Sequence, residues 1–372
     1  MAAYTLFSLI FPTLACAAAT IETEKHSITY QIVTSGLSHP WSLAFLPDGR
    51  FLVTERNGQL KRVDTQGNQE KVLIEDLSPI EQHGQGGLLD VVLHPDFKDN
   101  RWVYLSFAEK GKGGYGTAVA RGKLIDNRIN GAEVIFRMAW KTHSTRHFGS
   151  RLIFDNEGFL YITLGDRGDR PRAQDLGDHA GSLIRLHDDG SIPKDNPFAG
   201  RLFAKKEIYS YGHRNIQGAA IHPDTGELWI HEHGPQGGDE INIPLPGKNY
   251  GWPIITYGAN YGTGTKIGEG THKTGMEQPV YHWTPSIAPS GMAFYDADRF
   301  SHWKGSLFVG SLKFRLLTRL ELDGEQVIHE ERLLSGELGR IRDVRQGPDG
   351  LLYLLTDDDN GKLVRVLPSP DR

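Results

Sequence analysis

Short runs of alternating apolar and polar residues recur along the chain, each followed by a turn and a second such run. The runs are rich in β-branched and aromatic residues and the turns in Pro, Asp, Asn and Gly, a pattern typical of β-hairpins. The same phrase occurs six times, with starts 48 to 73 residues apart. Its copies are residues 43–54 (LAFLPDGRFLVT), 91–106, 151–163, 218–231, 291–310 and 342–356.

Further strands predict how these hairpins assemble. Strand-like segments follow several of them, at residues 59–63, 182–186, 316–322 and 362–367. Three or four strands per repeat are typical of propeller blades, whereas a β-sandwich would not repeat one hairpin six times. We therefore predict an all-β fold, a six-bladed β-propeller with four-stranded antiparallel blades in a single domain, residues 20–372. The spare strand at 27–34 (SITYQIVT) should complete the last blade and close the ring.

The N-terminal segment resembles a secretion signal. Residues 4–14 form an apolar run too short to span a bilayer, and small residues follow at 15–19, although no Lys or Arg precedes the run. We expect 1–19 to be a cleaved signal peptide and the protein to be periplasmic or secreted. The alternatives are a buried N-terminal strand and lipid anchoring at Cys16, where Thr13 stands in place of the usual leucine. No later segment is long and apolar enough to be transmembrane.

Composition narrows the function classes. Nothing in the formal net charge of −5 suggests a nucleic-acid or membrane-surface partner. Cys16 is the only cysteine, so the mature chain would have neither disulfides nor thiolate catalysis. The 44 glycines and 10 % aromatic residues agree with strands joined by turns.

Polar residues gather just before the first strand or just after the second strand of several hairpins, positions that meet at one end of a propeller. The cationic residues among them are Arg214, Lys313, Arg340 and Arg342. Buried cations need anionic partners. Two explanations stay open: a polyanionic ligand, or ion pairs with Asp166, Asp239 and Asp343.

Several longer phrases carry a resemblance to a known family. They are GQGGLLDVVLHPDF (84–97), SRLIFD (150–155), GSIPKDNPF (190–198), GHRNIQG (212–218), HGPQGGDEIN (233–242), NYGWP (249–253) and RIRDV (340–344). From about His39 to Val366 the chain resembles the soluble quinoprotein sugar dehydrogenases, which use pyrroloquinoline quinone (PQQ). Its length and the phrase RHFGSRL are most similar to the aldose sugar dehydrogenase type.

The resemblance implies roles for individual residues. His147 matches the catalytic base, and Asp166 an acidic residue that orients it. The positions that match PQQ-binding residues are Gln85, Arg214, Asn215, Lys313, Arg340 and Arg342, with Tyr261 as a stacking residue. Gly234 and Pro235 match carbonyl ligands of a calcium ion beneath PQQ, and Glu240 and Tyr250 match a second, structural calcium site.

The implied reaction is oxidation of the C1 hydroxyl of aldoses to lactones, with PQQ and Ca²⁺ as cofactors. The electron acceptor would be a quinone or a small redox protein. Arg146 and Pro171 depart from the glucose-type enzymes, which have an acidic and a polar residue at these positions, so the preferred sugar stays open.

Two other functions compete with this one. A calcium-dependent sugar lactonase would need an acidic metal cage on the axis, and a binding propeller would leave His147 and Gln85 without a purpose. Weaker motifs are interpreted as structural. Residues 111–116 match G-x-G-x-x-G but lie between strands, His231 and His233 lack a third zinc ligand, and 357–359 (DDD) predicts a solvated turn.

Overall fold

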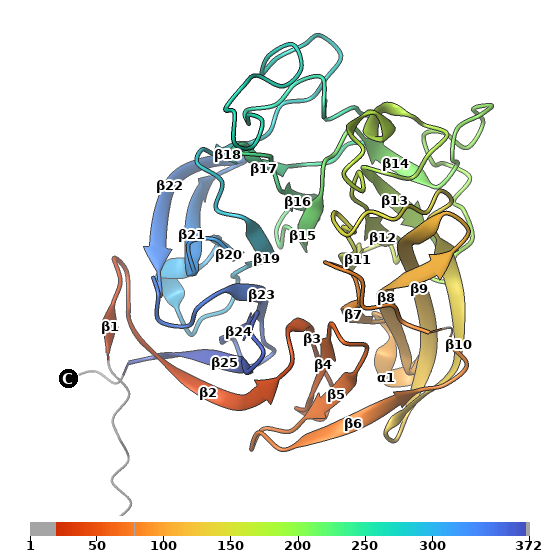
Figure 1. Cartoon of the computed structure of the whole chain (residues 1–372). Helices are drawn as coiled ribbons and strands as arrows, with labels where there is room; N and C mark the ends of the chain where they lie inside the picture. Colours follow the sequence, from red (N-terminus) through yellow and green to blue (C-terminus); the bar gives the residue numbers. More distant parts are fainter. Residues whose placement is uncertain (1–19, 78, 370–372) are drawn as a thin grey trace, which may run out of the picture.

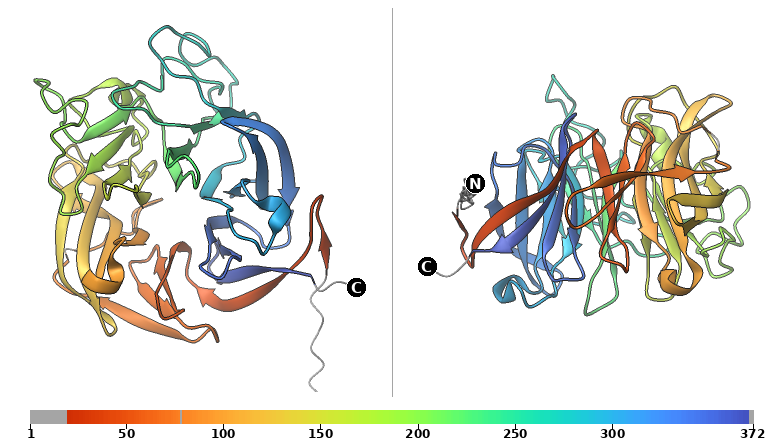
Figure 2. Two further views of the ribbon diagram at one scale, coloured as in Figure 1. Left: turned by 180° about the vertical axis from the view of Figure 1, so that it is seen from behind. Right: turned by 90° about the horizontal axis from the view of Figure 1, so that it is seen from below.

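The computed structural model describes residues 20–77 and 79–369, and β-strands dominate them. The sheets stand around a central axis, which Figures 1 and 2 show from the front, from behind and from below. This arrangement is consistent with a propeller and confirms the all-β prediction. Within these residues no helix is both long and apolar enough to cross a membrane. The predicted signal peptide lies outside the described residues and stays a prediction.

Most strands fall into groups of four that are consecutive in the chain and antiparallel to their neighbours. The groups are β3 (Pro40–Phe45), β4 (Phe51–Glu55), β5 (Leu60–Val63) and β6 (Gln69–Ile74); β7 (Leu88–Leu93), β8 (Trp102–Gly111), β9 (Gly114–Ile125) and β10 (Arg128–Arg137); β11 (Leu152–Phe154), β12 (Leu160–Thr163), β13 (Ser182–Leu186) and β14 (Ile208–Tyr211); β15 (Ile216–Ile221), β16 (Leu228–Glu232), β17 (Asp239–Asn242) and β18 (Tyr281–Trp283); and β19 (Pro289–Phe294), β20 (Leu307–Ser311), β21 (Leu316–Asp323) and β22 (Gln326–Leu333).

The first two groups are joined into one eight-stranded sheet. A short parallel pairing of β6 with β10, Arg128 with Leu73 and Ile129 with Ile74, makes the connection. The predicted hairpins are present with small shifts of their ends. Two turns contain short helices that the strand pattern did not predict, α1 (Phe97–Asn100) and η2 (Ser301–Trp303), and η1 (Arg170–Gln174) lies in the loop after β12.

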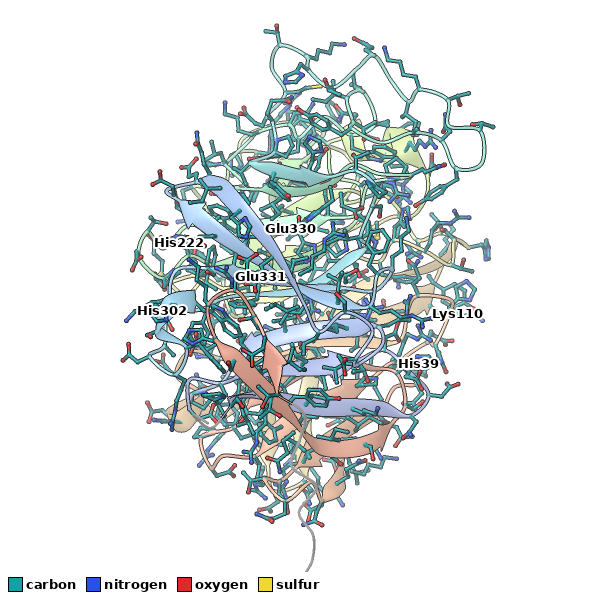
Figure 3. All side chains as sticks on the ribbon, turned by 90° about the vertical axis from the view of Figure 1, so that its left-hand side faces the viewer. His39, Lys110, His222, His302, Glu330 and Glu331 are labelled. Atoms are coloured by element: carbon teal, nitrogen blue, oxygen red, sulfur yellow. The ribbon has the colours of Figure 1, made fainter. Side chains whose placement is uncertain are left out.

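The last sheet contains both ends of the described chain. β2 (Ser27–Leu37) pairs antiparallel with β25 (Gly361–Pro368), which continues through β24 (Leu352–Thr356) to β23 (Ile341–Gln346). The predicted closing strand is therefore confirmed. β1 (Ile21–Glu22) adds a fifth strand, so this sheet has five strands and not the predicted four. Glu24 fixes the β1–β2 turn to the neighbouring sheet, since its N–H donates to Glu331 over 2.6 Å. Glu331 is labelled on that sheet in Figure 3.

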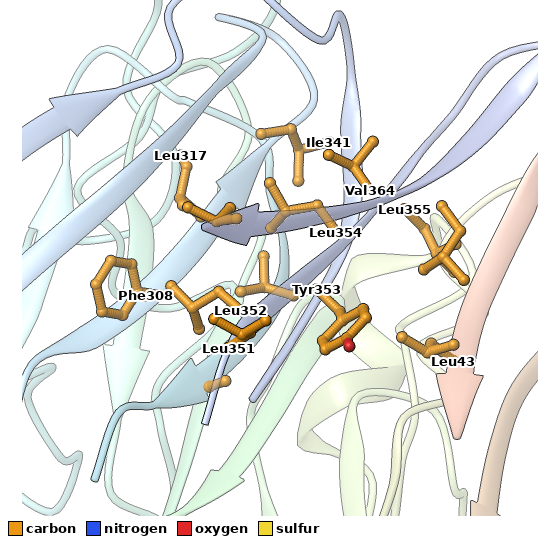
Figure 4. Packing of buried hydrophobic residues seen from close by; sticks show 14 of the residues in the cluster. Leu43, Phe308, Leu317, Ile341, Leu351, Leu352, Tyr353, Leu354, Leu355 and Val364 are labelled. Atoms are coloured by element: carbon orange, nitrogen blue, oxygen red, sulfur yellow. The ribbon is translucent and has the colours of Figure 1, made fainter. Parts of the chain in front are cut away.

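The strands nearest the axis are β3, β7, β11, β15, β19 and β23, and each contacts the next, with β23 returning to β3. Apolar side chains fill the space between neighbouring sheets. Between the last two sheets, for example, Phe308 and Leu317 pack with Leu352 and Leu354 (Figure 4). Each such side chain stabilises the fold by about 1.5–3 kcal/mol. This packing fixes the inner strands, whose starting ends carry the loops of the site.

A buried ionic cluster ties the inner strands together near the axis. Arg151, just before β11, lies 3.4 Å from Asp90 on β7 and 3.0 Å from Asp343 on β23. Arg345 bridges the same two carboxylates at 3.1 and 3.0 Å. The Arg151 guanidinium also lies 4.2 Å from the Trp41 ring centroid. Two cations and two anions therefore balance where three sheets meet.

Candidate functional site

Two adjoining cavities lie where the inner strands begin. The larger has a volume of about 480 Å³ and the smaller of about 390 Å³, and both are lined by Gln85 and His233. The predicted convergence of loops is thus confirmed. The larger cavity contains the predicted residues Gln85, Asn215, Lys313, Arg340 and Arg342, and the smaller contains Gln85, His147, Arg214 and Tyr261.

The larger cavity is strongly cationic. Five basic side chains line it, namely Arg56, Lys313, Arg315, Arg340 and Arg342, against one acid, Asp357. Asp357 Oδ2 lies 2.9 Å from Arg340 and 3.2 Å from Arg342, and Oδ1 lies 2.9 Å from His39 Nδ1. Burial opposes ionisation of Asp357, but Arg342, His39 and Arg340 hold its pKa well below the ordinary value. The expected solvated turn at 357–359 is therefore wrong for Asp357, which is buried.

More positive charge faces this cavity than the chain itself neutralises. Among residues 20–77 and 79–369, Lys313 and Arg315 form no ion pair, and the buried Nε atoms of Arg56 and Arg342 have no hydrogen-bond partner. The acids proposed as partners are used elsewhere: Asp166 pairs with His147, Asp239 accepts from backbone amides, and Asp343 pairs with Arg151 and Arg345. The cavity is thus suited to an anionic ligand.

His147 lies at the smaller cavity in a tightly wound loop. His147 and Gly149 both have positive φ, 58° and 63°. A Cβ at Gly149 would lie 2.6 Å from the backbone of Leu164, so this position requires glycine. The backbone N–H of His147 donates to Gln85 Oε1 over 2.8 Å. The loop therefore fixes the imidazole relative to Gln85, a member of both cavities.

A hydrogen-bonded chain orients the imidazole. His147 Nδ1 lies 2.6 Å from Asp166 Oδ1, while Trp252 Nε1 donates to Asp166 Oδ2 over 2.8 Å and Gly168 N–H donates to Oδ1 over 2.7 Å. Because the Asp166 carboxylate can only accept this hydrogen bond, Nδ1 of His147 carries the proton and Nε2 keeps its lone pair. Sequence reasoning did not assign Trp252, although the quoted phrase NYGWP contains it.

The charges of this pair follow from burial. Burial lowers the pKa of His147, and the hydrogen bond to Asp166 only partly opposes this effect. Burial alone would raise the pKa of Asp166, but His147 and Arg214 bring it below its ordinary value. At neutral pH the imidazole is therefore neutral and the carboxylate charged. A neutral imidazole with a free Nε2 can accept a proton from a bound hydroxyl.

Arg214 and Asn215 fix the loops around this pair. Arg214 Nη1 donates to the carbonyl oxygens of His233 and Gly234 over 2.9 and 2.7 Å. Asn215 Oδ1 accepts from Gly149 N–H over 3.1 Å. Tyr261 lies at the rim of the smaller cavity with 64 % of its surface exposed.

The residues that match calcium ligands lie beside these cavities. Gly234, Glu240 and Tyr250 line a third cavity of about 10 Å³, whereas Pro235 is buried and lines none of the three. Burial and the neighbouring Glu232 raise the pKa of Glu240 well above its ordinary value. The described residues contain no group of three or more His, Cys, Asp or Glu side chains placed to hold a metal.

Asp239 organises this side of the site, and the sequence did not identify that role. Its Oδ1 accepts from Gly234 N–H over 2.8 Å, and Oδ2 accepts from Ser286, Ile287 and Ala288 over 2.7 to 2.9 Å. The loop after β16 and the loop before β19 are thereby joined through one carboxylate. The phrase HGPQGGDEIN contains Asp239, but its spacing alone does not indicate which backbone amides it accepts from.

Three histidines in and beside the site predict a loss of stability in acid. Burial lowers the pKa of His233 to about 3 and lowers those of His147 and His231. Below about pH 6.5 the unfolded chain binds protons that the folded chain does not, so the free energy of unfolding should fall by about 1.4 kcal/mol per pH unit for His233 alone. Thermal unfolding between pH 8 and 5 measures this slope. His233→Gln should reduce it, while His143→Gln, at an exposed position, should not; equal slopes for all three proteins would contradict the assignment.

Comparison with known proteins agrees with this geometry. A model of the glucose/sorbosone dehydrogenase family matches residues 37–365. The chain is 46 % identical to aldose sugar dehydrogenase YliI of Escherichia coli (strain K12), over 95 % of this chain and 97 % of that protein. The crystal structure of the Escherichia coli soluble aldose sugar dehydrogenase in the apo-form is similar, with a TM-score of 0.89 over 92 % of this chain and 100 % of that chain.

A second solved structure is similar over most of the chain. The PQQ-bound form of aldose sugar dehydrogenase from Streptomyces coelicolor is 30 % identical, with a TM-score of 0.75 over 91 % of this chain and 98 % of that chain. The chain is therefore an oxidoreductase of the glucose/sorbosone dehydrogenase family.

Proposed function

We propose that the chain is a PQQ- and calcium-dependent aldose sugar dehydrogenase that oxidises the C1 hydroxyl of aldoses to lactones. The observation that carries this proposal is the cationic cavity of 480 Å³ adjoining the neutral His147. The similarity to the aldose sugar dehydrogenase of Escherichia coli and to the PQQ-bound enzyme of Streptomyces coelicolor supports it.

The larger cavity fits a flat tricarboxylate such as PQQ. The unsatisfied Arg342 Nε and the unpaired Lys313 offer donors for carboxylates, and Arg340 adds a third cation. Gln85, which lines both cavities, and Asn215, which lines the larger one, supply neutral amide groups. We assign these residues, together with Arg214, to the PQQ site, with Tyr261 at its rim.

The chain's own residues account for the proton transfer. The sugar binds in the smaller cavity with its C1 hydroxyl toward His147 Nε2, which accepts the hydroxyl proton while Asp166 stabilises the resulting imidazolium. The bond between C1 and hydrogen breaks as the bond between C1 and oxygen gains double-bond character, giving the lactone. When bound, PQQ supplies the two-electron acceptor for the hydride that leaves C1, and calcium supplies positive charge that polarises the quinone.

Calcium fits the two proposed positions unequally. At the first, the Gly234 carbonyl already accepts a hydrogen bond from Arg214, so calcium and this guanidinium compete for one oxygen. At the second, Glu240 lies opposite Glu232 on paired strands, and a cation between them would relieve their repulsion. We therefore assign Glu240 and the loop around Tyr250 to the structural ion, and the carbonyls of Gly234 and Pro235 to the ion beneath PQQ, where calcium and Arg214 would compete for the Gly234 oxygen.

The remaining assignments are also part of this proposal. The groups from β3 to β22, with the eight-stranded sheet counted as two, and the closing sheet would make six blades. Residues 1–19 would direct export to the periplasm or beyond. The electron acceptor would be a quinone or a small redox protein.

The direct test is titration of the purified apo-protein with PQQ, with and without Ca²⁺, followed by dye reduction with glucose and other aldoses. We expect saturable PQQ binding and PQQ-dependent turnover, and about hundredfold weaker binding by Arg342→Met, because a charged donor is lost. Arg50→Met, whose partner is the surface residue Asp48, should bind as wild type does. Absence of both saturable binding and turnover with any common aldose would refute the proposal.

Trp252→Phe should lower kcat about tenfold to hundredfold, because the buried Asp166 Oδ2 loses its donor and the imidazole loses its orientation. The KM for the sugar should change little, since Trp252 lines neither of the two cavities proposed to hold the sugar and PQQ. Steady-state kinetics separate the two constants. Trp140→Phe, at an exposed tryptophan, is the control, and a Trp252→Phe enzyme with wild-type kcat would exclude this positioning role.

A hydrolytic function is not favoured. His213 lies 2.9 Å from Ser210 Oγ and 2.8 Å from Glu232, the order of groups in a hydrolase triad. Ser210 is completely buried, however, and lines none of the three cavities of the site. The cationic lining of the larger cavity likewise differs from the acidic cage that a lactonase would need.

A further inference from the structure

The loop between β13 and β14 exposes two large apolar side chains almost completely. Leu202 and Phe203 are 82 % and 95 % exposed, the highest values among the large apolar residues that the structure describes. Phe203 also has a φ of 61°, a conformation that bulky residues rarely adopt. We name Leu202 and Phe203 the apolar tip. The backbone here holds an aromatic ring away from the protein.

The loop that carries the apolar tip is firmly attached. Asn196 Nδ2 donates to the carbonyl oxygens of Arg185 and Lys206 over 3.0 Å each. Lys205 N–H donates to Leu176 O over 2.8 Å. Phe198, four residues before the tip, is buried in an apolar cluster. Hydrogen bonds and the buried Phe198 therefore hold in place the loop that exposes the tip.

A third exposed apolar residue, Trp140, lies close to this loop in the fold. Trp140 is 62 % exposed, and its carbonyl oxygen accepts from Arg172 over 2.7 Å. Hydrogen bonds connect the residue before Trp140 to the loop of the tip: His179 Nδ1 accepts from Ala139 N–H over 3.0 Å, and His179 Nε2 lies 2.8 Å from Glu207. Tryptophan is enriched where proteins meet the lipid interface.

The charge around the apolar tip is positive in a chain whose net charge is −5. Residues 201–206 (RLFAKK) contain Arg201, Lys205 and Lys206 and no acid. The acid that follows, Glu207, lies 2.8 Å from His179, and Asp195 of the same loop is paired with Arg185 at 3.1 Å. A convex apolar tip with basic residues on both sides is the chemistry that anionic lipid surfaces recognise.

We propose that the apolar tip inserts into an anionic lipid surface, with Arg201, Lys205 and Lys206 at the phosphate groups and Trp140 at the interface. A lipid surface deforms around a protruding ring, whereas a protein partner would have to supply a matching pocket. Each basic residue near such a surface strengthens binding roughly fivefold. The proposal is independent of the proposed enzymatic function. With that function, it would favour a lipid-soluble quinone as electron acceptor.

The test is sedimentation of the chain beginning at residue 20 with vesicles of phosphatidylglycerol and phosphatidylcholine. This chain keeps every described strand, since β1 begins at Ile21. We expect binding to mixed vesicles, little binding to pure phosphatidylcholine, and at least tenfold weaker binding by the double variant Leu202→Ser, Phe203→Ser and by the triple variant Arg201→Gln, Lys205→Gln, Lys206→Gln. Dye-linked turnover should stay unchanged in both variants, because no residue of the site is altered.

Ile328→Ser is the matched control, because Ile328 is also exposed but lies on β22, in another sheet. It should bind vesicles as wild type does, and equal thermal unfolding temperatures would show that all variants are folded. The proposal is overturned if the wild-type chain does not bind the mixed vesicles, and a protein would then be the remaining candidate partner of the tip. It is equally overturned if the double variant binds as tightly as wild type.

Discussion

His147→Gln should lower kcat for aldose oxidation about a thousandfold, because the only imidazole bonded to Asp166 is then lost from the described site. General-base catalysis contributes about 10²–10⁴-fold, and glutamine cannot accept the proton at neutral pH. PQQ binding should stay within about twofold of wild type, since the cationic cavity is not altered. Steady-state dye reduction and PQQ titration measure the two effects separately.

His143→Gln is the matched control, an exposed histidine in the same loop. Its kcat should equal that of wild type. The pH profile gives a second readout: because burial lowers the pKa of His147, wild-type kcat/KM should begin to fall only below about pH 6.5. Asp166→Asn should move this fall to still lower pH, since Asp166 raises the pKa of His147. A His147→Gln enzyme with near-wild-type turnover would show that another group is the base.

Arg151→Met should lower the free energy of unfolding by about 3–5 kcal/mol, the usual cost of leaving buried carboxylates short of a partner. Asp90 and Asp343 are both buried and would keep only Arg345 as a cation between them. The stacking on Trp41 would be lost as well. Urea unfolding followed by tryptophan fluorescence should show a lower midpoint with an unchanged slope.

Arg185→Met is the control for this variant. Arg185 is nearly as buried, but its partner Asp195 has a side chain 68 % exposed to water, which can solvate the abandoned charge. We expect a loss near 1 kcal/mol there. If Arg151→Met unfolded at the same urea concentration as Arg185→Met, Arg151 would contribute no more stability than the half-exposed Arg185–Asp195 pair. Asp343→Asn combined with Arg151→Met should lose less than the sum of the single changes.

The hairpin pattern predicted the fold well because each copy carries its own strands and turn. The closing strand at 27–34 was predicted from the same alternation and pairs with β25. The β6–β10 pairing was not predicted, since edge-to-edge contacts between successive groups depend on how far each outer strand extends. β1 was missed because two residues give no periodicity, and α1 because one turn of helix gives none either.

The site was predictable in its location and less so in its contacts. Loop residues of a propeller meet where the inner strands begin, and this rule predicted that Gln85, His147 and Arg342 lie close together. The structure places them at two adjoining cavities. The acidic partner of the cations was not predictable. In the sequence Asp357 belongs to a run of three acids that resembles a solvated turn, and only the fold brings it beside Arg340 and Arg342. The roles assigned by resemblance to Gly234, Pro235, Glu240 and Tyr250 stay predictions.

The pairing of β2 with β25 has a consequence for the order of events during folding. These strands are more than 320 residues apart in the chain, so β2 cannot form its pairing until β25 has been synthesised. Contacts of such long separation form slowly, and until then both strands present unpaired edges. At high protein concentration β2 of one copy can meet β25 of another first. Refolding should therefore yield strand-exchanged dimers that dilution before refolding suppresses.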